Sequence, residues 1–221
     1  MLKEKVDSPS VIQFEIGPMQ NFVYLILDHE SRKAAVVDPQ KNLSEPLGAI
    51  SSQGYTLSLV LLTHSHHDHI AGVPELVKTH PEVPIILHEE EVHRLDRGSR
   101  QNGKLQLVRD GDEIGLGNSV IRVLHTPGHS SGECSYLLEG IPPQLFTGDT
   151  VFIRDCGRTD LPTGSTSEMF ETLQRLKKLA PETVILPGHH YKPEFKSTLE
   201  RELRESPPFQ CKNVEELAAL P

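Results

Sequence analysis

The chain has 221 residues, a length that fits one domain and allows a sizeable buried core. Its formal net charge of −9 at pH 7 gives no reason to expect a nucleic-acid partner or attraction to anionic membranes. No apolar run reaches the roughly twenty residues of a membrane span, and residues 1–5 lack the apolar core of a signal peptide.

The cysteines indicate a reducing compartment. Cys134, Cys156 and Cys211 are odd in number and widely spaced, so they predict neither a disulfide framework nor a zinc knuckle. Because the chain shows no linker, repeat or low-complexity tract, we expect one domain over residues 1–221 with a short helical tail from about residue 193. We expect a cytoplasmic protein, and the sequence leaves open whether it is a monomer or a homodimer.

The first third of the chain predicts an antiparallel meander followed by helices and a buried strand. Short apolar runs bounded by turn residues predict three strands, at residues 11–16, 22–27 and 33–37. Apolar spacing then predicts a helix over residues 43–52, which Gly54 ends. The apolar run of residues 59–62 predicts a fully buried strand, and another helix is expected over residues 71–80.

The rest of the chain alternates short strands with helices. Apolar runs predict strands at residues 84–88, 105–108, 113–114, 120–124, 135–138, 144–147 and 183–186. Amphipathic or charged segments predict helices at residues 89–97, 165–179, 194–205 and 213–220. Thr166 and Ser167 are the expected caps of the second of these helices, and Pro207 and Pro208 are expected to break the third.

A dense group of metal-capable side chains follows the buried strand of residues 59–62. The next seven residues read T-H-S-H-H-D-H and supply three imidazoles and one carboxylate as candidate ligands: His64, His66, His69 and Asp68. This donor mix suits zinc or iron better than magnesium or calcium, which prefer shells made of oxygen atoms. A buried strand that ends in such a group delivers the side chains to a fixed point at the rim of a sheet.

Three later strands also end in a metal-capable residue. In each case a glycine comes first, where the backbone must bend sharply or approach another segment closely: Gly128-His129, Gly148-Asp149 and Gly188-His189. One such residue would be weak support for a metal site. The recurrence of strand, glycine and ligand predicts that the four loops converge on a single centre.

These motifs resemble those of a known family. They are H-x-H-x-D-H at residues 64–69, T-P-G-H at 126–129, F-T-G-D at 146–149 and P-G-H at 187–189. Together they are similar to the metallo-β-lactamase superfamily, and the resemblance runs over nearly the whole chain. It implies an α/β fold, the αββα four-layer sandwich, with metals at one edge between the two sheets.

The resemblance also implies two metal sites that share one carboxylate. The implied ligand sets are His64, His66 and His129 for one metal, and Asp68, His69 and His189 for the other. Asp149 would bridge them, since a carboxylate has two oxygens and can neutralise part of two cations. Two zinc ions are the expected cofactors, and Asp68 would also act in catalysis by orienting the hydroxide held between them.

Within the superfamily, further motifs are similar to glyoxalase II, whose members cleave thioesters of glutathione. These motifs are G-P-M-Q-N at residues 17–21, F-T-G-D-T at 146–150, C-G-R at 156–158 and G-H-H-Y at 188–191. The resemblance implies hydrolysis of a thioester by a metal-bound hydroxide, with Arg158 and Tyr191 contacting glutathione or a similar thiol carrier. An ion pair of Arg158 with Asp155 or Asp160 is an equally open reading.

Two alternatives remain open for the activity. Residues 156–160, C-G-R-T-D, are just as similar to persulfide dioxygenases, sister enzymes that act on glutathione persulfide. Such an enzyme would hold one iron through the residues matching His64, His129 and Asp149. The third reading is a non-catalytic binding scaffold, which would not need the complete ligand set found here. For His67 and His125 we expect no ligand role.

Overall fold

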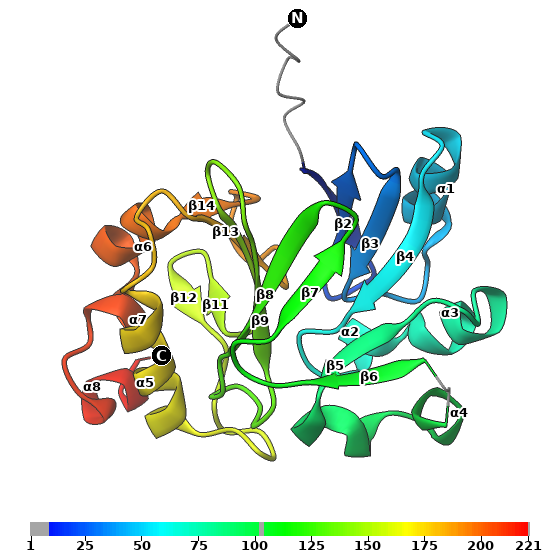
Figure 1. The fold of residues 1–221 in the computed structure, drawn as a ribbon. Helices are drawn as coiled ribbons and strands as arrows, with labels where there is room; N and C mark the ends of the chain where they lie inside the picture. The colour runs from blue at the N-terminus through cyan, green and yellow to red at the C-terminus, as the bar shows by residue number, and fades with distance from the viewer. Residues whose placement is uncertain (1–8, 102–103, 221) are drawn as a thin grey trace, which may run out of the picture.

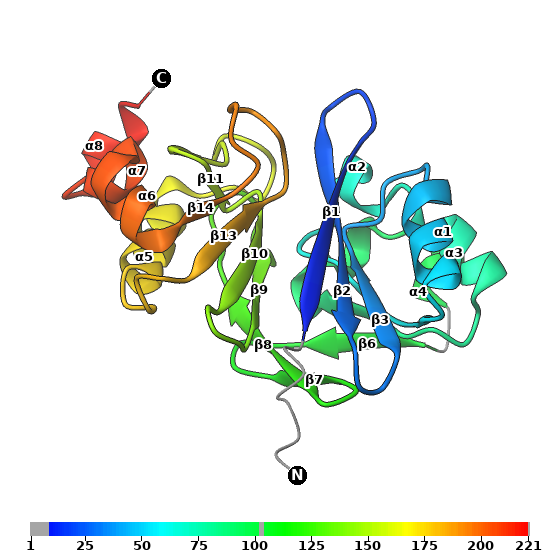
Figure 2. The same cartoon turned by 90° about the horizontal axis from the view of Figure 1, so that it is seen from above.

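The computed structural model describes residues 9–101 and 104–220, so the expectation about residues 1–5 lies outside the described part of the chain. Two sheets of six strands each lie face to face (Figure 1). Helices from the N-terminal half cover the outer face of one sheet, and helices from the C-terminal half cover the other (Figure 2). These four layers confirm the predicted αββα sandwich.

The first sheet combines an antiparallel edge with parallel strands. In spatial order its strands are β1 (Ser10–Ile16), β2 (Asn21–Asp28), β3 (Lys33–Val37), β4 (Thr56–Leu61), β5 (Ile85–His88) and β6 (Leu105–Val108). β1, β2 and β3 pair antiparallel, which confirms the predicted meander, whereas β3 to β6 pair in parallel. Parallel strands end at the same edge of a sheet, so the residues that follow them gather there.

The second sheet is mostly antiparallel. In spatial order its strands are β14 (Ser197–Thr198), β13 (Val184–Pro187), β10 (Gln144–Gly148), β9 (Cys134–Leu138), β8 (Ser119–His125) and β7 (Glu113–Leu116). Only β10 and β13 pair in parallel, so the loops after these two strands leave the sheet at one edge. A hairpin that the sequence pattern did not predict follows β10, with strands β11 (Val151–Phe152) and β12 (Asp155–Cys156).

The helices of the described residues are short. They are α1 (Ser44–Ser52), α2 (His67–Ile70), α3 (Val73–Thr79), the 3-10 helix η1 (Glu89–Arg94), α4 (Arg97–Arg100), α5 (Thr166–Leu176), α6 (Leu199–Glu205), α7 (Pro207–Gln210) and α8 (Val214–Ala218). Within residues 9–101 and 104–220, no helix has the length and apolar character needed to cross a membrane.

The side-chain alternation along β2 shows how one strand serves two cores. Tyr24 and Ile26 pack between the two sheets, whereas Val23, Leu25 and Leu27 pack in a second cluster with α1 and α3. Every residue of β2 is buried, because both faces of the sheet are covered. A third cluster joins the second sheet to α5 through α8. The division into one domain with a helical tail stays a prediction.

Two helix predictions are wrong in part. In place of one amphipathic α-helix over residues 89–97, the chain forms the 3-10 helix η1, which ends at Arg94, and α4, which begins at Arg97. The charged helix starts only at Leu199, because the segment before it pairs with β13 as β14. The predicted break at Pro207 and Pro208 is confirmed, because α6 ends at Glu205. The two prolines also begin α7, since proline is tolerated in a first helical turn where no backbone N–H donor is needed.

The caps and bounds of two other helices also differ from the prediction. Ser165 caps α5, with its Oγ accepting a hydrogen bond from the backbone N–H of Glu168 at 3.3 Å, so the expected caps Thr166 and Ser167 are wrong. The helix predicted over residues 71–80 is α3 alone. A separate helix, α2, starts inside the histidine-rich segment and carries two of the candidate ligands.

An ion-pair network ties the segment before α6 to the hairpin of β11 and β12. Glu194 accepts two hydrogen bonds from Arg154 and one from Arg201, each at 2.8 Å. The bonds from Arg154, followed by the bond from Arg201, lower the pKa of Glu194 to about 2. A carboxyl with a lowered pKa stabilises the fold above its unfolded pKa of about 4.3. This stabilisation is lost as the pH falls toward the folded value.

We therefore expect Glu194→Gln to lower the midpoint of thermal unfolding at neutral pH and to lower it less in acid, below the unfolded pKa. The difference at neutral pH is expected to be modest, because ion pairs that are partly open to solvent contribute little. Circular dichroism of chelator-treated proteins measures both midpoints. Glu182→Gln removes an exposed carboxylate outside this network and is the control. A difference that does not change with pH would contradict the expectation.

Candidate metal centre

Four loops meet at the edge of the sandwich where the parallel strands end. One loop follows each of the strands β4, β8, β10 and β13. These loops carry, in that order, the candidate ligands of residues 64–69, 129, 149 and 189. Backbone hydrogen bonds join the two sheets here. Phe22 N donates to Gly188 O at 2.8 Å, and Cys134 N donates to Thr63 O at 2.8 Å. The four loops therefore converge, as the sequence predicts.

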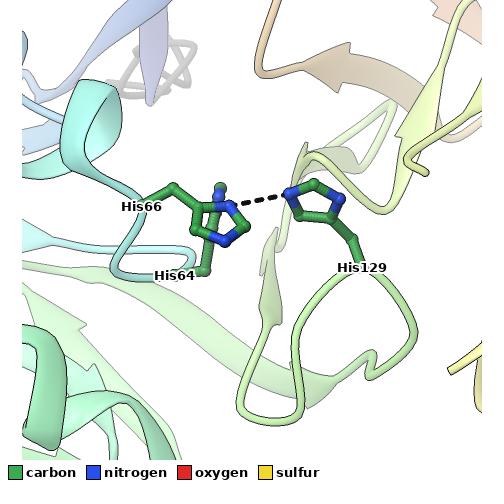
Figure 3. A group of neighbouring side chains, drawn as sticks. All are labelled: His64, His66 and His129. Atoms are coloured by element: carbon green, nitrogen blue, oxygen red, sulfur yellow. Dashed lines mark hydrogen bonds between the residues drawn. The ribbon is translucent and has the colours of Figure 1, made fainter. Parts of the chain in front are cut away.

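The first cluster consists of three imidazoles, those of His64, His66 and His129 (Figure 3). Nδ1 of His66 lies 2.8 Å from Nε2 of His129. The ring of His64 stands edge-on to both, with centroid distances of 4.7 Å to His66 and 5.2 Å to His129. The potential ligand atoms of the three side chains lie within 4.8 Å of one another, so one ion could contact all three.

The second cluster consists of Asp68 and His69 from α2 and His189 from the loop after β13. Nε2 of His69 lies 3.2 Å from Nε2 of His189. Oδ2 of Asp68 lies 3.3 Å from Nε2 of His189 and 3.5 Å from Nε2 of His69. These three ligand atoms also lie within 4.8 Å of one another.

Asp149 lies between the two clusters. Its Oδ1 is 3.2 Å from Nε2 of His69 and 3.4 Å from Nε2 of His189. Its Oδ2 is 3.5 Å from Nε2 of His129, on the side of the first cluster. One oxygen of this buried carboxylate thus faces each cluster, which is the arrangement that a bridging ligand needs.

Protein oxygens hold three of these rings by the nitrogen that faces away from the centre. The Nδ1 contacts are His69 with Asp38 Oδ2 at 2.9 Å, His129 with Arg158 O at 2.8 Å, and His189 with Met19 O at 2.8 Å. An Nδ1–H that donates to such an oxygen leaves the Nε2 lone pair directed into the centre. Metal-binding histidines in proteins are usually held in this way.

Carboxylates give the second cluster an affinity for positive charge. Burial opposes a charge on His189, but the nearby carboxylates of Asp149 and Asp68 outweigh it and raise the pKa of His189 to about 9. Burial would likewise raise the pKa of Asp149, but the neighbouring His69 and His189 hold it well below its ordinary value. In the chain alone, protons on the imidazoles of His69 and His189 balance the negative charge of these carboxylates. A bound cation would replace those protons.

Two imidazoles of the first cluster, those of His64 and His66, are neutral in the chain alone. Burial, followed by the neighbouring side chains of His129 and Arg94, lowers the pKa of His66 to about 4. Burial is also the main cause that lowers the pKa of His64 well below its ordinary value. Neutral imidazole is the form that binds metal ions.

The residues present fit a metal centre. Nε2 of His64 is buried and has no hydrogen-bond partner among the described residues, although it faces the other two imidazoles of its cluster. Oδ1 of Asp149 approaches two imidazoles but makes no hydrogen bond of good geometry within the described part of the chain. A cation would satisfy both atoms, and a donor set of five imidazoles and two carboxylates suits zinc or iron.

The glycines before the candidate ligands are required by the structure, as the sequence predicts. Gly128 and Gly148 have φ angles of +147° and +50°, which side chains rarely allow. A Cβ on Gly148 would also lie 2.5 Å from Oγ1 of Thr63. Gly188 is needed for close approach, because a Cβ there would lie 2.5 Å from Oδ1 of Asp149.

Glu91 joins two of the loops, and sequence reasoning missed it. Its fully buried carboxylate accepts hydrogen bonds from N and Oγ of Ser65, from Oγ of Ser130 at 2.8 Å and from N of Gly132 at 3.1 Å. Ser65 lies between two ligands of the first cluster, and the other two donors follow His129. Burial would raise the pKa of Glu91, but these hydrogen bonds outweigh it and lower the pKa, so the carboxylate is ionised at neutral pH.

Asp38 and Asn21, also missed, support the second cluster. Asp38 accepts hydrogen bonds from N and Oγ1 of Thr63 at 2.8 and 2.6 Å, besides its contact with His69. Asn21 donates from Nδ2 to Oδ2 of Asp68 at 2.8 Å. Asp38 directly follows β3, the parallel neighbour of β4, so its place at the same sheet edge was a usable signal.

A cavity of about 1100 Å³ opens over the centre. Tyr191 lines it, and its ring stacks on His189 at 4.8 Å with an angle of 10° between the planes. Phe152 meets Tyr191 edge-on at 5.1 Å, so aromatic rings form one wall. Burial, followed by the charges of Asp149 and Asp68, raises the pKa of Tyr191 to about 12, so the phenol keeps its proton at neutral pH.

Arg158 also lines this cavity, and it makes the ion pair that the sequence left open. Its Nε and Nη2 lie 2.6 and 2.7 Å from the two carboxylate oxygens of Asp160. The Arg158 side chain is 64% exposed. A cavity position and a local ion pair thus occur together, so the role of Arg158 in substrate binding stays a prediction.

The two histidines for which no ligand role was expected lie outside both clusters. The side chain of His67 is 86% exposed. The ring of His125 stacks on His88 at 4.3 Å, and its Nε2 contacts the carbonyl oxygen of Ser131 at 2.8 Å. Neither belongs to the groups of side chains that could hold an ion among the described residues.

Comparison with known proteins gives a consistent result. A hydroxyacylglutathione hydrolase from Synechococcus sp. is 37% identical over 177 residues, which is 77% of this chain. ETHE1 from Myxococcus xanthus has a TM-score of 0.84 and 30% identity, and the match covers 96% of this chain and 92% of that chain. TTHA1623 in a di-iron-bound form has a TM-score of 0.72 and 30% identity, with coverage of 89% and 98%.

The extent of these matches differs. The chain spans 65% of the length of the Synechococcus hydrolase, which is the longer protein. The family model described as the metallo-beta-lactamase superfamily matches residues 16–189, a range that includes every candidate metal ligand. Because this match covers well over half of the chain and the fold agrees with it, the chain belongs to the metallo-beta-lactamase superfamily, whose members bind metal ions.

Proposed function

We propose that the chain is a metal-dependent hydrolase that cleaves a thioester of glutathione or of a similar thiol carrier. The observation that carries this proposal is the position of Asp149, which turns one oxygen toward each of the two clusters. The 37% identity to a hydroxyacylglutathione hydrolase supports the choice of a thioester. The cavity over the centre has the size of a small-molecule site.

Two zinc ions are the proposed cofactors. The proposed ligands are His64, His66 and His129 for one ion, Asp68, His69 and His189 for the other, and Asp149 for both. When bound, such ions polarise a carbonyl oxygen and lower the pKa of a coordinated water molecule. The outer hydrogen bonds to Asp38, Arg158 O and Met19 O keep the ligand rings in place before any ion arrives.

The reaction adds water to the thioester carbonyl carbon and breaks the carbon–sulfur bond, releasing a carboxylate and a thiol. Asp68 is proposed to orient the attacking water. Burial would raise its pKa, but hydrogen bonds with His189 and Asn21 hold the pKa of Asp68 well below its ordinary value, so it is an acceptor at neutral pH. The phenol of Tyr191 is proposed to donate a hydrogen bond to the substrate.

A persulfide dioxygenase is the second candidate. The 96% coverage by ETHE1 at a TM-score of 0.84 supports it. This enzyme would act on glutathione persulfide and bind one iron through His64, His129 and Asp149, leaving the second cluster without an ion. For either activity we propose a cytoplasmic location, which the three free cysteines support.

We expect protein purified without added metal to contain two zinc ions per chain and to release thiol from a glutathione thioester. Elemental analysis and a thiol assay measure these quantities, and an oxygen electrode measures uptake with glutathione persulfide. Removal of the metal with a chelator is expected to abolish thiol release, and added zinc to restore it. One iron per chain with oxygen uptake, and no thioester cleavage, would establish the dioxygenase instead. A protein that binds no metal even after reconstitution would contradict both enzyme proposals and would favour a non-catalytic binding scaffold.

A further inference from the structure

A second cation of the cavity wall is placed differently from Arg158. Arg94 is the last residue of η1, is half-buried and lines the cavity together with His66. Its Nη2 donates to the carbonyl oxygen of Pro162 at 2.8 Å and to Oγ1 of Thr163 at 3.2 Å. Both partners are neutral, and Arg94 makes no ion pair with a carboxylate of residues 9–101 or 104–220.

The two arginines of the cavity wall therefore differ in how freely each could bind an anion. The positive charge of Arg158 is compensated by Asp160, whose two carboxylate oxygens lie 2.6 and 2.7 Å from Nε and Nη2 of Arg158. Arg94 keeps an uncompensated positive charge at the wall, and this charge acts on His66 of the first cluster. Both contacts use Nη2, so at most two of its five N–H donors are engaged.

A half-buried cation without a counter-ion is in an unfavourable state that an anionic ligand would relieve. The guanidinium suits a carboxylate in particular, because its planar fork can donate two parallel hydrogen bonds. The loop of Pro162 and Thr163 holds one edge of the guanidinium in a fixed orientation, so little side-chain entropy would be lost on binding.

We propose that Arg94 forms a binding subsite for a carboxylate of the substrate, on the His66 side of the cavity. The inference rests on the proposed function and extends it, since it makes Arg94 rather than Arg158 the residue that selects anionic thiol carriers. It also sets the direction of the bound substrate. The carboxylate that Arg94 binds lies toward η1 and the first cluster, whereas the rings of Tyr191 and Phe152 line the cavity beside His189.

The test compares substrate charge at constant shape. A glutathione thioester and its dimethyl ester differ in the carboxylates and not in the reacting bond. We expect Arg94→Gln to raise KM for the charged thioester about tenfold or more. The same variant is expected to leave KM for the diester and kcat for both substrates nearly unchanged. Arg158→Gln is expected to change the two KM values by the same factor.

Two controls separate recognition from loop anchoring and from bulk charge. Thr163→Val keeps the shape of the side chain and removes its hydrogen bond with Arg94, so it reports the effect of a loosened loop. Arg97→Gln removes an exposed cation of α4 that does not line the cavity. Both variants are expected to keep the preference for the charged thioester. An equal rise of both KM values in Arg94→Gln, or loss of the preference in Arg158→Gln instead, would overturn the inference.

Direct binding separates this inference from the proposed hydrolysis. S-methylglutathione carries the same carboxylates and has no thioester to cleave. In calorimetry on the metal-loaded protein, Arg94→Gln is expected to weaken its binding about tenfold, and Arg97→Gln to leave it unchanged. If no thioester is cleaved but this loss is seen, the hydrolase proposal fails and the subsite stands. If binding is equal in wild type and Arg94→Gln, the subsite is refuted, whatever the hydrolysis assay shows.

Discussion

Asp149→Ala is expected to bind neither metal ion firmly and to lose about a thousandfold or more of the thioester hydrolysis. The carboxylate is shared, with Oδ1 at 3.2 Å from Nε2 of His69 and Oδ2 at 3.5 Å from Nε2 of His129. Polarisation by a bound metal contributes several kcal/mol to transition-state stabilisation. About 4 kcal/mol corresponds to about three powers of ten in rate.

Elemental analysis of the purified variant and a thiol-release assay measure both effects of Asp149→Ala. Asp155→Ala is the matched control, because Asp155 lines the same cavity but is exposed, and its Oδ1 accepts only from N of Cys156 at 2.9 Å among the described residues. This control is expected to retain its metal. An Asp149→Ala protein with full metal content and full activity would rule out the bridging role.

Glu91→Ala is expected to destabilise the protein by about 3 kcal/mol or more, without removing any metal ligand. The substitution leaves the donors of Ser65, Ser130 and Gly132 without their acceptor, and buried unsatisfied groups cost about 1–3 kcal/mol each. The two loops of the first cluster would also lose their common anchor. For a residue that orients metal ligands in this way, a loss of about 10- to 100-fold in metal affinity is expected.

Chemical denaturation of chelator-treated protein measures the stability of Glu91→Ala, and titration with zinc measures its metal affinity. Glu90→Ala is the control, since the neighbouring Glu90 side chain is exposed. It is expected to match wild type in both measurements. A Glu91→Ala protein that loses stability but binds zinc with unchanged affinity would show that Glu91 stabilises the fold and does not position the ligands.

Local sequence was sufficient to locate the candidate ligands, because the information is short in range. An apolar run marks a strand buried on both faces, and the residue after it must lie at a sheet edge. The glycine that precedes Asp149 or His189 indicates how tightly the backbone passes there, and the close approaches at Gly148 and Gly188 follow that pattern. The strand ends therefore predicted that the four loops converge, whereas the four layers and the edge between the two sheets were implied by the resemblance to the metallo-β-lactamase superfamily.

Contacts between distant segments were decisive elsewhere. Glu91 stands in a run of three acidic residues that predicts a solvated helix face, yet it is 1% exposed, because donors about 40 residues later in the chain approach it. The start of the helix predicted over residues 194–205 was wrong for a similar reason. The edge of β13 was free to pair with a further strand, and this pairing prevails over local helix propensity.

The sequence by itself determined which residue types lie at the ends of the buried strands, and hence the chemistry available to the site. Only the tertiary structure decided the distances of Asp149 from the two clusters, which the resemblance implied it would bridge, and the positions of Asp38 and Glu91 behind them. It also decided that Asp160 compensates Arg158 while Arg94 is left without a carboxylate partner among the described residues. The physical reason is that charge compensation and hydrogen-bond satisfaction depend on distances between atoms of loops far apart in sequence, and local pattern does not contain those distances.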